Sequence, residues 1–388
     1  MIPTKNSRFD VVIIGAGPAG TTCAALLARR GIRVHLCDKA TFPREKICGD
    51  CINPECWDFF NVLGVGDDVA ANAERISGIQ IAGRSGNVLD VPVRSTLSNK
   101  TGGPFVAIKR AKLDSILLHH AVLEGVTFCE ATSIDSCLFE PSKNGNWQVR
   151  LRSREAGDIT NIVCDTLIGA DGRNSRVAKL LAGTGDAQKS LKEKSSDRIG
   201  VQFAVQRTLT STSEVFMFFF KGGYGGIVGV TPEEANVAMV VTRDLAQLAM
   251  TDFNSFVART IQSNQSAHRI VPELDLMGEI HTAFPIVPGG TERKYSCAYL
   301  IGDARRTTEP FTGEGVFFAM QDGLRTAHSI LKSVGIMPGS LTSPLRSRFW
   351  RDNIFSPVLQ RESMTESLLA LGMRYNSLAQ LASRMVFR

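Results

Sequence analysis

Residues 9–20 read FDVVIIGAGPAG, an apolar run that leads directly into three closely spaced glycines. The run predicts a buried strand, Ala19–Arg30 predicts a helix, and Arg33–Cys37 predicts a second strand, which together make a βαβ unit. In such a unit the first glycine permits a tight turn, the second lets the backbone approach a pyrophosphate, and the third lets helix and strand pack closely. The pattern therefore predicts a dinucleotide whose diphosphate lies at the helix N terminus.

The expected contacts to this dinucleotide come from the glycine loop and from the end of the second strand. The loop residues are Gly15, Gly17, Pro18, Ala19 and Gly20. Asp38 follows the second strand, about 20 residues further on, where a carboxylate can bind the hydroxyls of a ribose. We expect Asp38 to make that contact and Lys39 to lie beside it at the cofactor.

Three later segments extend the pattern beyond one βαβ unit: Arg110-x-x-Leu113-Asp114, Gly169-Ala170-Asp171-Gly172, and Gly302-Asp303 followed by Pro310 and Thr312-Gly313-Glu314-Gly315. With the glycine loop, and in this order from about Asp10 to His328, they resemble the para-hydroxybenzoate-hydroxylase-like superfamily of FAD proteins. The resemblance implies FAD as the cofactor, with Arg110 and Asp171 at the nucleotides and Asp303 at the ribityl chain. Without a ligand, Asp171 is a strand-end turn residue and Asp303 a helix cap.

The segment after Pro310 has a further role by this resemblance. In the superfamily it begins a helix aimed at the flavin ring, where backbone amides stabilise charge on the reduced ring. Pro310 and Val316 are therefore expected at the cofactor. Gly313, Glu314 and Gly315 are candidates for both cofactor contact and catalysis.

Residues 42–50 read FPREKICGD and resemble the arginine-lysine-cysteine-glycine loop of the geranylgeranyl reductase family. Residues 312–316 are similar to that family's glycine-glutamate-glycine segment at the flavin. By this resemblance Arg44 and Gly49 contact FAD, and Cys48 lies close to the ring and faces the substrate. The alternatives are a buried packing role for Cys48 and a surface ion pair for Arg44.

Two departures from the reductase family are visible. Residues 222–229 read GGYGGIVG, so Tyr224 matches a tyrosine of the family's substrate sheet, while its tryptophan and Phe-Pro are missing. Arg305 and Arg306 replace small residues after Asp303. These two cations could meet an acidic substrate, a carrier phosphate or the cofactor, or remain solvated. The tryptophan-rich motif and active-site lysine of flavin halogenases are not visible.

Composition narrows the function classes. The 388 residues are 43% hydrophobic and 21% charged, which is typical of globular proteins. The net charge of +6 suits anionic ligands, and no Lys/Arg run indicates a nucleic-acid partner. Nine scattered cysteines predict reduced thiols. Cys48-x-x-Cys51 lacks a second pair at ligand spacing, so no metal site is expected.

The predicted fold class is α/β (α+β), a Rossmann-type FAD-binding domain with an inserted mixed or antiparallel substrate sheet and C-terminal helices. The FAD-binding domain is expected to be discontinuous, over residues 1–75, 105–190 and 275–335. The substrate domain is expected over 76–104 and 191–274, and a helical segment over 336–388. Residues 345–388 alternate apolar and basic residues, which predicts helices that close the fold or, alternatively, a surface that contacts a membrane.

The substrate sheet suggests the reaction. Phe216, Phe218 and Phe220 lie on one face of a predicted strand, and Val215, Met217 and Phe219 on the other, so one row lines either a cleft or a core. An apolar cleft suits a hydrophobic or aromatic small molecule or a lipid. The first hypothesis is a C=C reductase or dehydrogenase with hydride transfer through flavin N5 and Cys48 or water as acid. The alternatives are a monooxygenase and a flavoprotein that modifies or chaperones a partner protein.

Three further expectations accompany these hypotheses. NADPH or NADH is expected as the electron donor. Its binding is expected to be transient, because no second nucleotide-binding βαβ unit is evident. No apolar stretch approaches the roughly 18 residues of a membrane span, and residues 1–10 lack a signal-peptide core. A cytoplasmic location is therefore expected, with peripheral membrane contact through the C-terminal helices as the alternative. No oligomeric state follows from the sequence.

Overall fold

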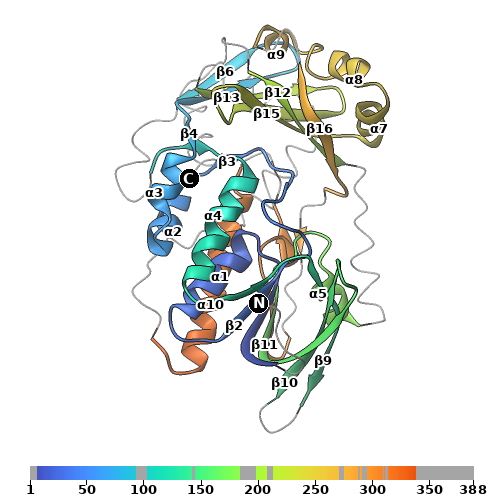
Figure 1. Cartoon of the computed structure of the whole chain (residues 1–388). Helices are drawn as coiled ribbons and strands as arrows, with labels where there is room; N and C mark the ends of the chain where they lie inside the picture. Colours follow the sequence, from blue (N-terminus) through green and yellow to red (C-terminus); the bar gives the residue numbers. More distant parts are fainter. Residues whose placement is uncertain are drawn as a thin grey trace.

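The fold is known from a computed structural model, which describes residues 7–92, 103–141, 145–183, 198–207, 213–270, 275–286, 289–290, 295–308, 310 and 313–337. The C-terminal segment predicted over 336–388 lies, beyond Met337, outside the described residues. Two sheets dominate the described part of the chain, one above the other in Figure 1.

The lower sheet carries the nucleotide fold. Its path is β8-β2-β1-β11-β10-β9, and β18 pairs with β11 beyond this path. Strands β8, β2, β1, β11 and β18 run parallel to one another, whereas β10 pairs antiparallel with both β11 and β9. The bounds are β1 Ser7–Ile14, β2 Val34–Cys37, β8 Thr127–Cys129, β9 Thr132–Glu140, β10 Asn146–Ser153, β11 Ile159–Gly169 and β18 Ala298–Leu300.

Helices cover one face of this sheet, where α1 packs between the strands and the long helix α10 (Figure 1). A side chain at Gly323 of α10 would put its Cβ 2.5 Å from the Ala19 carbonyl oxygen, so this glycine lets the two helices approach closely. The bounds are α1 Pro18–Ala28, α2 Cys56–Leu63, α3 Gly66–Ala71, α4 Arg110–Leu123 and α10 Gly315–Ser333, with a 3₁₀ turn η2 at Gly302–Ala304. Helix α5, Arg176–Ala182, packs against the opposite face of the sheet.

The upper sheet has the order β16-β12-β15-β14-β13-β5-β6 and is antiparallel except where β13 meets β5. Its bounds are β5 Gly78–Ala82, β6 Val88–Pro92, β12 Ile199–Gln206, β13 Glu214–Phe220, β14 Gly223–Gly229, β15 Glu234–Val241 and β16 Leu276–Ala283. Strand β16 pairs with β12 here, although the sequence assigned residues 275–335 to the nucleotide domain. The alternation of apolar and polar residues in β16 is weak because it is an exposed edge strand.

Alternate residues of the upper sheet face in opposite directions. Phe216, Phe218 and Phe220 pack beneath α7, α8 and α9, which lie above the sheet (Figure 1). The opposite row, Val215, Met217 and Phe219, faces the nucleotide domain. The three helices span α7 Arg243–Thr251, α8 Phe253–Arg259 and α9 Gln265–Ile270.

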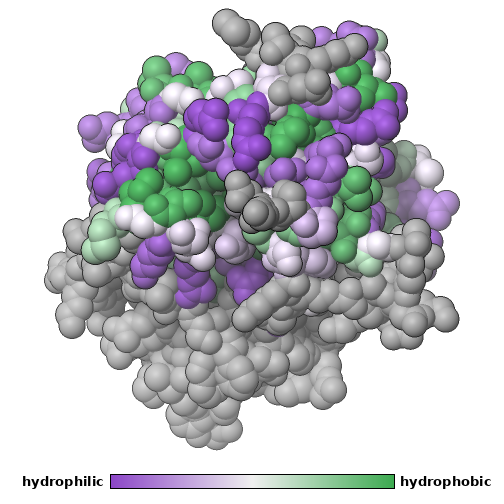
Figure 2. Space-filling model, turned by 90° about the horizontal axis from the view of Figure 1, so that it is seen from below, coloured by the Kyte–Doolittle hydropathy of each residue, from purple (hydrophilic) through white to green (hydrophobic). Residues whose placement is uncertain are grey.

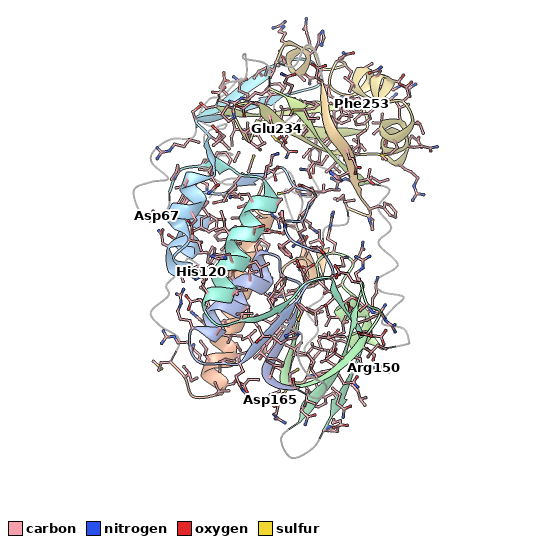
Figure 3. All side chains as sticks on the ribbon, in the orientation of Figure 1. Asp67, His120, Arg150, Asp165, Glu234 and Phe253 are labelled. Atoms are coloured by element: carbon pink, nitrogen blue, oxygen red, sulfur yellow. The ribbon has the colours of Figure 1, made fainter. Side chains whose placement is uncertain are left out.

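Short strands and ion pairs connect the two layers. The bounds are β3 Cys51–Ile52, β4 Glu74–Arg75 and β7 Val106–Ala107, with a separate pair β17 Gly289–Gly290 and β19 Arg306–Thr307. Glu234 lies in the upper sheet (Figure 3), and its Oε2 is 2.5 Å from Nζ of Lys109, directly before α4. This contact holds the upper sheet over the nucleotide domain.

The surface gives one finding about membranes. Within the described residues, no helix is both long and apolar enough to cross a bilayer. Figure 2 shows small hydrophobic patches separated by hydrophilic residues on the face seen from below.

Candidate cofactor and active site

The glycine loop between β1 and α1 packs closely against neighbouring backbone, which side chains at its glycines would prevent. Gly15 has φ +108°, and a Cβ there would lie 2.4 Å from the Ala170 carbonyl oxygen. A Cβ at Gly20 would lie 1.9 Å from the Gly15 carbonyl oxygen. Gly17 precedes Pro18 and Ala19 at the start of α1, and no described side chain caps this N terminus. The backbone amides there are available to an anion such as a diphosphate.

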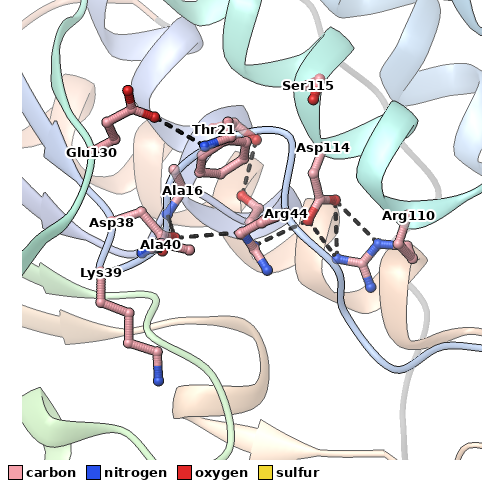
Figure 4. Close-up of polar contacts among 12 residues, drawn as sticks. Ala16, Thr21, Asp38, Lys39, Ala40, Arg44, Arg110, Asp114, Ser115 and Glu130 are labelled. Carbon is pink, nitrogen blue, oxygen red and sulfur yellow. Dashed lines mark hydrogen bonds and ion pairs between the residues drawn. The ribbon is translucent and has the colours of Figure 1, made fainter. Parts of the chain in front are cut away.

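Asp38 closes this loop onto β2. Its Oδ2 accepts a hydrogen bond from the Ala16 amide at 2.8 Å, and its Oδ1 accepts one from the Ala40 amide at 2.9 Å (Figure 4). The side chain is buried at the carboxyl end of the strand. Lys39, the next residue, points away from these contacts (Figure 4).

Arg44 belongs to a buried network rather than to a surface ion pair. Its Nη2 lies 3.0 Å from Oδ2 of Asp114, and its Nε lies 3.8 Å from Oδ2 of Asp38 (Figure 4). Arg110 donates to the same Asp114 carboxylate through Nε at 3.1 Å and Nη2 at 3.0 Å. One fully buried carboxylate therefore holds two guanidinium groups between the glycine loop and Cys48.

The Cys48 thiol lies close to Arg110, whose guanidinium charge acts on it. Burial raises the pKa of the thiol, although the Arg110 charge opposes this rise. The Arg110 pKa is raised because attraction to Asp114 and Cys48 outweighs burial, so its charge is retained. Gly49 is exposed directly after the thiol.

Asp50 is a third group in this loop and has an unusual environment. Its backbone has φ 55°, in the left-handed region that few residues other than glycine and asparagine favour. Its Oδ1 accepts a hydrogen bond from the Arg110 amide at 3.2 Å. Burial raises the pKa of this carboxyl to about 8, so it is largely protonated at neutral pH.

Asp171, in the motif Gly169-Ala170-Asp171-Gly172, stabilises the N terminus of α5. Its Oδ1 accepts from the Ser175 hydroxyl at 2.5 Å, and its Oδ2 accepts from the Arg176 amide at 2.6 Å. The adjacent Gly172 has φ +80°, and Nζ of Lys46 would lie 3.7 Å from a Cβ built there. Burial lowers the pKa of Lys46 to about 8, although attraction to Asp303 opposes this.

Gly302 and Asp303 lie between the first turns of the two long helices. A Cβ at Gly302 would be 3.0 Å from Cβ of Ala19 in α1 and 3.6 Å from Cβ of Ala319 in α10. The Gly302 amide donates to Oδ2 of buried Asp322 at 3.2 Å. Oδ1 of Asp322 also lies 3.2 Å from Nη1 of Arg305, so this cation has a partner within the protein. Arg306 lies in β19, paired with Gly290.

The start of α10 adjoins the Cys48 loop. Gly313 has φ +65°, and a Cβ there would be 3.5 Å from the Cys51 carbonyl oxygen. Glu314 is fully buried, with Oε1 3.5 Å from Nδ2 of Asn53. Gly315 begins the helix, whose N terminus no described side chain caps, and Val316 is buried behind it. Pro310 is exposed before this turn.

Tyr224 lies on the face of the upper sheet that is directed toward the nucleotide domain. It packs with Phe219, Val240 and Ile286, and its hydroxyl lies 3.3 Å from Nη2 of Arg198. This cluster is apolar, with the Arg198–Tyr224 pair at its edge.

These features fit FAD. Two long helices present uncapped N termini, α1 to a diphosphate and α10 to a flavin, and Gly302 and Asp303 lie between them. The strands and loops thus bring together Asp38, Arg44, Arg110, Asp303 and Gly315.

Sequence reasoning missed several residues of this neighbourhood, namely Lys46, Asp50, Asn53, Gln202, Asn236 and Asp322. A detectable signal existed for three of them. Asp322 interrupts an apolar helix face, and Gln202 and Asn236 interrupt apolar strands. Such buried polar residues require hydrogen-bond partners, so they point to contacts between elements.

Comparison with known proteins agrees with this geometry. Residues 8–334 match the profile of a family described as an FAD binding domain. The chain is 27% identical over 336 residues to conditioned medium factor receptor 1 of Dictyostelium discoideum, covering 81% of this chain but only 62% of that protein. It is 27% identical over 348 residues to a menaquinone reductase of Mycolicibacterium smegmatis, covering 87% of this chain and 80% of the relative.

A solved structure shares the fold. The myxobacterial chondrochloren halogenase superposes with a TM-score of 0.73 at 21% identity, over 85% of this chain and 76% of the halogenase. At that identity the likeness shows the fold alone, namely a Rossmann-type FAD-binding domain with a second sheet, as predicted from the sequence.

Proposed function

This chain belongs to the FAD binding domain family and is an FAD-dependent oxidoreductase, and from that premise we propose that it reduces a carbon–carbon double bond in a hydrophobic, isoprenoid-like substrate. FAD, once reduced by NADPH or NADH, would supply the two electrons of such a reduction as a hydride. The proposal depends above all on the surroundings of Cys48, a thiol in contact with a buried cation beneath an apolar sheet face.

Reduction of a double bond adds a hydride to one carbon and a proton to the other, and Cys48 is the proposed source of the proton. Burial raises the pKa of this thiol, so Sγ carries a proton at neutral pH. After the proton leaves, a thiolate remains, and the Arg110 guanidinium beside it stabilises that negative charge. Water then returns the proton to Sγ, which restores the starting state.

The proposed substrate class follows from the underside of the upper sheet. Phe219, Tyr224, Val240 and Ile286 are buried there, and Met217 packs against them. An apolar wall with few polar groups favours a hydrocarbon chain or aromatic ring. The resemblance of residues 42–50 to the geranylgeranyl reductase loop and the menaquinone reductase relative support a lipid of this kind. We propose NADPH or NADH as the transient electron donor.

A monooxygenase that hydroxylates an aromatic or lipidic substrate is the alternative, because the same apolar wall would also protect an oxygen-derived reagent from water. The third hypothesis is a flavoprotein that acts on a partner protein, with the basic tail and the pair Arg305 and Arg306 as its docking surface. Arg305 instead pairs with buried Asp322 within the fold, which weakens that hypothesis.

Replacing the thiol tests the proposed chemistry. Cys48→Ala should lower kcat for NADPH-driven reduction of a polyprenyl quinone by about 10²-fold, as expected for loss of a general acid, while bound FAD and its visible spectrum are retained. Cys137→Ala, which removes a half-buried thiol of β9, is the control and should leave kcat unchanged. Wild-type kcat in Cys48→Ala would remove Cys48 from the reaction.

A further inference from the structure

The backbone of Cys48 is held from above by two amide side chains of the upper sheet. The Cys48 amide donates to Oε1 of Gln202 at 2.9 Å, and the Cys48 carbonyl accepts from Nδ2 of Asn236 at 2.9 Å. Nε2 of Gln202 then donates to Oδ1 of Asn236 at 3.0 Å. The three hydrogen bonds close a ring that joins the loop to β12 and β15, which lie 154 and 188 residues further along the chain.

Burial of the Gln202 and Asn236 side-chain amides at this position is unfavourable unless they form hydrogen bonds. Gln202 is 9% exposed and Asn236 is 4% exposed, on a face otherwise formed largely by apolar and small residues. A buried amide without partners is strongly unfavourable, so apolar residues would be expected here if the face only packed. Both amides instead direct hydrogen bonds to one residue, the proposed proton donor.

We infer that Gln202 and Asn236 are positioning residues that hold the Cys48 thiol at a fixed position relative to the substrate. The upper sheet thereby determines where the proton donor lies. The inference rests on the proposed role of Cys48. Neither amide has to touch the reacting atoms for this role, since both act through the Cys48 backbone. They also tie the sheet that contacts the substrate to the loop that carries the thiol.

Two neighbouring contacts support the same register. Gly200, two residues before Gln202, lies against Ile47, whose Cγ2 would be in ordinary contact, at 3.6 Å, with a Cβ at Gly200. Glu234, two residues before Asn236, pairs with Lys109 at the start of α4. The titratable groups that act on the thiol itself are Arg110, which is charged, and Asp50, which is largely protonated at neutral pH, whereas the two upper strands contribute uncharged amides.

Alkylation of Cys48 in the holoprotein measures its positioning without relying on turnover. We would treat wild type, Gln202→Met and Asn236→Leu with iodoacetamide and follow the Cys48 peptide by mass spectrometry. Each variant frees the loop from one hydrogen bond, so alkylation of Cys48 should be about fivefold faster, equivalent to about 1 kcal/mol at 1.4 kcal/mol per factor of ten. Gln80→Met, which removes an exposed amide contact to Asp90 in the same sheet, is the control and should match wild type.

Two further readouts separate positioning from general stability. Gln202→Glu keeps an oxygen acceptor for the Cys48 amide, so its alkylation rate should lie closer to wild type than that of Gln202→Met. In turnover, kcat should fall in Gln202→Met and Asn236→Leu with little change in KM, because the apolar wall is retained.

The outcomes distinguish this inference from the proposed function. Unchanged alkylation of Cys48 in both Gln202→Met and Asn236→Leu overturns the inference. Faster alkylation in these variants, together with wild-type turnover in Cys48→Ala, would show that Gln202 and Asn236 position Cys48 but would refute Cys48 as the proton donor. Faster alkylation in Gln80→Met as well would show a general loosening of the sheet and would also overturn the inference.

Discussion

Arg44, on the loop after β2, and Asp114, on α4, form a buried ion pair with Nη2 and Oδ2 3.0 Å apart. The same carboxylate binds Arg110, which contacts the Cys48 thiol. Asp114 is therefore the link between the cofactor side of the loop and its reactive side. A single residue of a helix fixes both ends of the segment 44–48.

Asp114→Asn should be strongly destabilising, because it leaves two buried guanidinium groups with a neutral partner. Removing one member of a buried ion pair costs about 3–5 kcal/mol, and we expect a loss in the free energy of unfolding of that order together with weaker FAD retention. Chemical denaturation and FAD occupancy after gel filtration measure the two effects. Asp165→Asn removes an exposed pair with Arg8 and should cost at most about 1 kcal/mol. Equal stability of the two variants would contradict the proposed role of Asp114.

Asp38→Ala should weaken FAD binding for two reasons. The expected ribose contact is lost, and the amides of Ala16 and Ala40 lose the carboxylate that holds them. We expect FAD to bind less tightly by about 1.5–3 kcal/mol, the usual contribution of a hydrogen bond to a charged group. Titration of apoprotein with FAD, followed by flavin fluorescence, measures this change. Unchanged affinity would remove Asp38 from the cofactor site.

The nucleotide fold was predictable because its signals are local. Glycines at 15, 17 and 20 require a tight turn, and the apolar run before them has the length of a strand, so β1, α1 and β2 appear where the sequence places them. The alternating rows of Val, Met and Phe over residues 215–220 likewise predicted β13. These patterns depend on neighbouring residues alone.

Other features depended on contacts between distant segments. Strand β16 belongs to the upper sheet because it pairs with β12. Since β16 is an exposed edge strand, its own residues do not show which sheet it joins. A surface ion pair was the alternative for Arg44 in the sequence, and the approach of α4 to its loop instead buries it beside Asp114. The hydrogen bonds of Gln202 and Asn236 to Cys48 join residues more than 150 positions apart.

Asp50 predicts a pH dependence of stability. Burial raises its folded-state pKa to about 8 from an ordinary value of 3.8, so the folded protein binds this proton more tightly than the unfolded chain does. The associated stability is fully present below about pH 4, declines as the pH rises, and is lost above about pH 8. Asp50→Asn cannot ionise and tolerates the left-handed backbone, so its Tm relative to wild type should rise between pH 5 and pH 9.

Differential scanning fluorimetry of both proteins across this range measures the difference. Buried His35, whose pKa is lowered to about 4 by burial, contributes the opposite trend at acidic pH, but it is common to both proteins and cancels. Parallel Tm curves for wild type and Asp50→Asn would mean that Asp50 is ionised in the folded protein.

The most direct test of the proposed reaction is the mass of the product formed without oxygen. The holoprotein would be incubated under anaerobic conditions with NADPH and a polyprenyl quinone, and the lipid analysed by mass spectrometry. The account predicts that, once the ring has been reoxidised to the quinone before analysis, the polyprenyl chain has gained two hydrogens, and that this product forms at the same rate in the absence and presence of oxygen. A lipid that is unchanged without oxygen and gains an oxygen atom when air is admitted would contradict it and identify a monooxygenase.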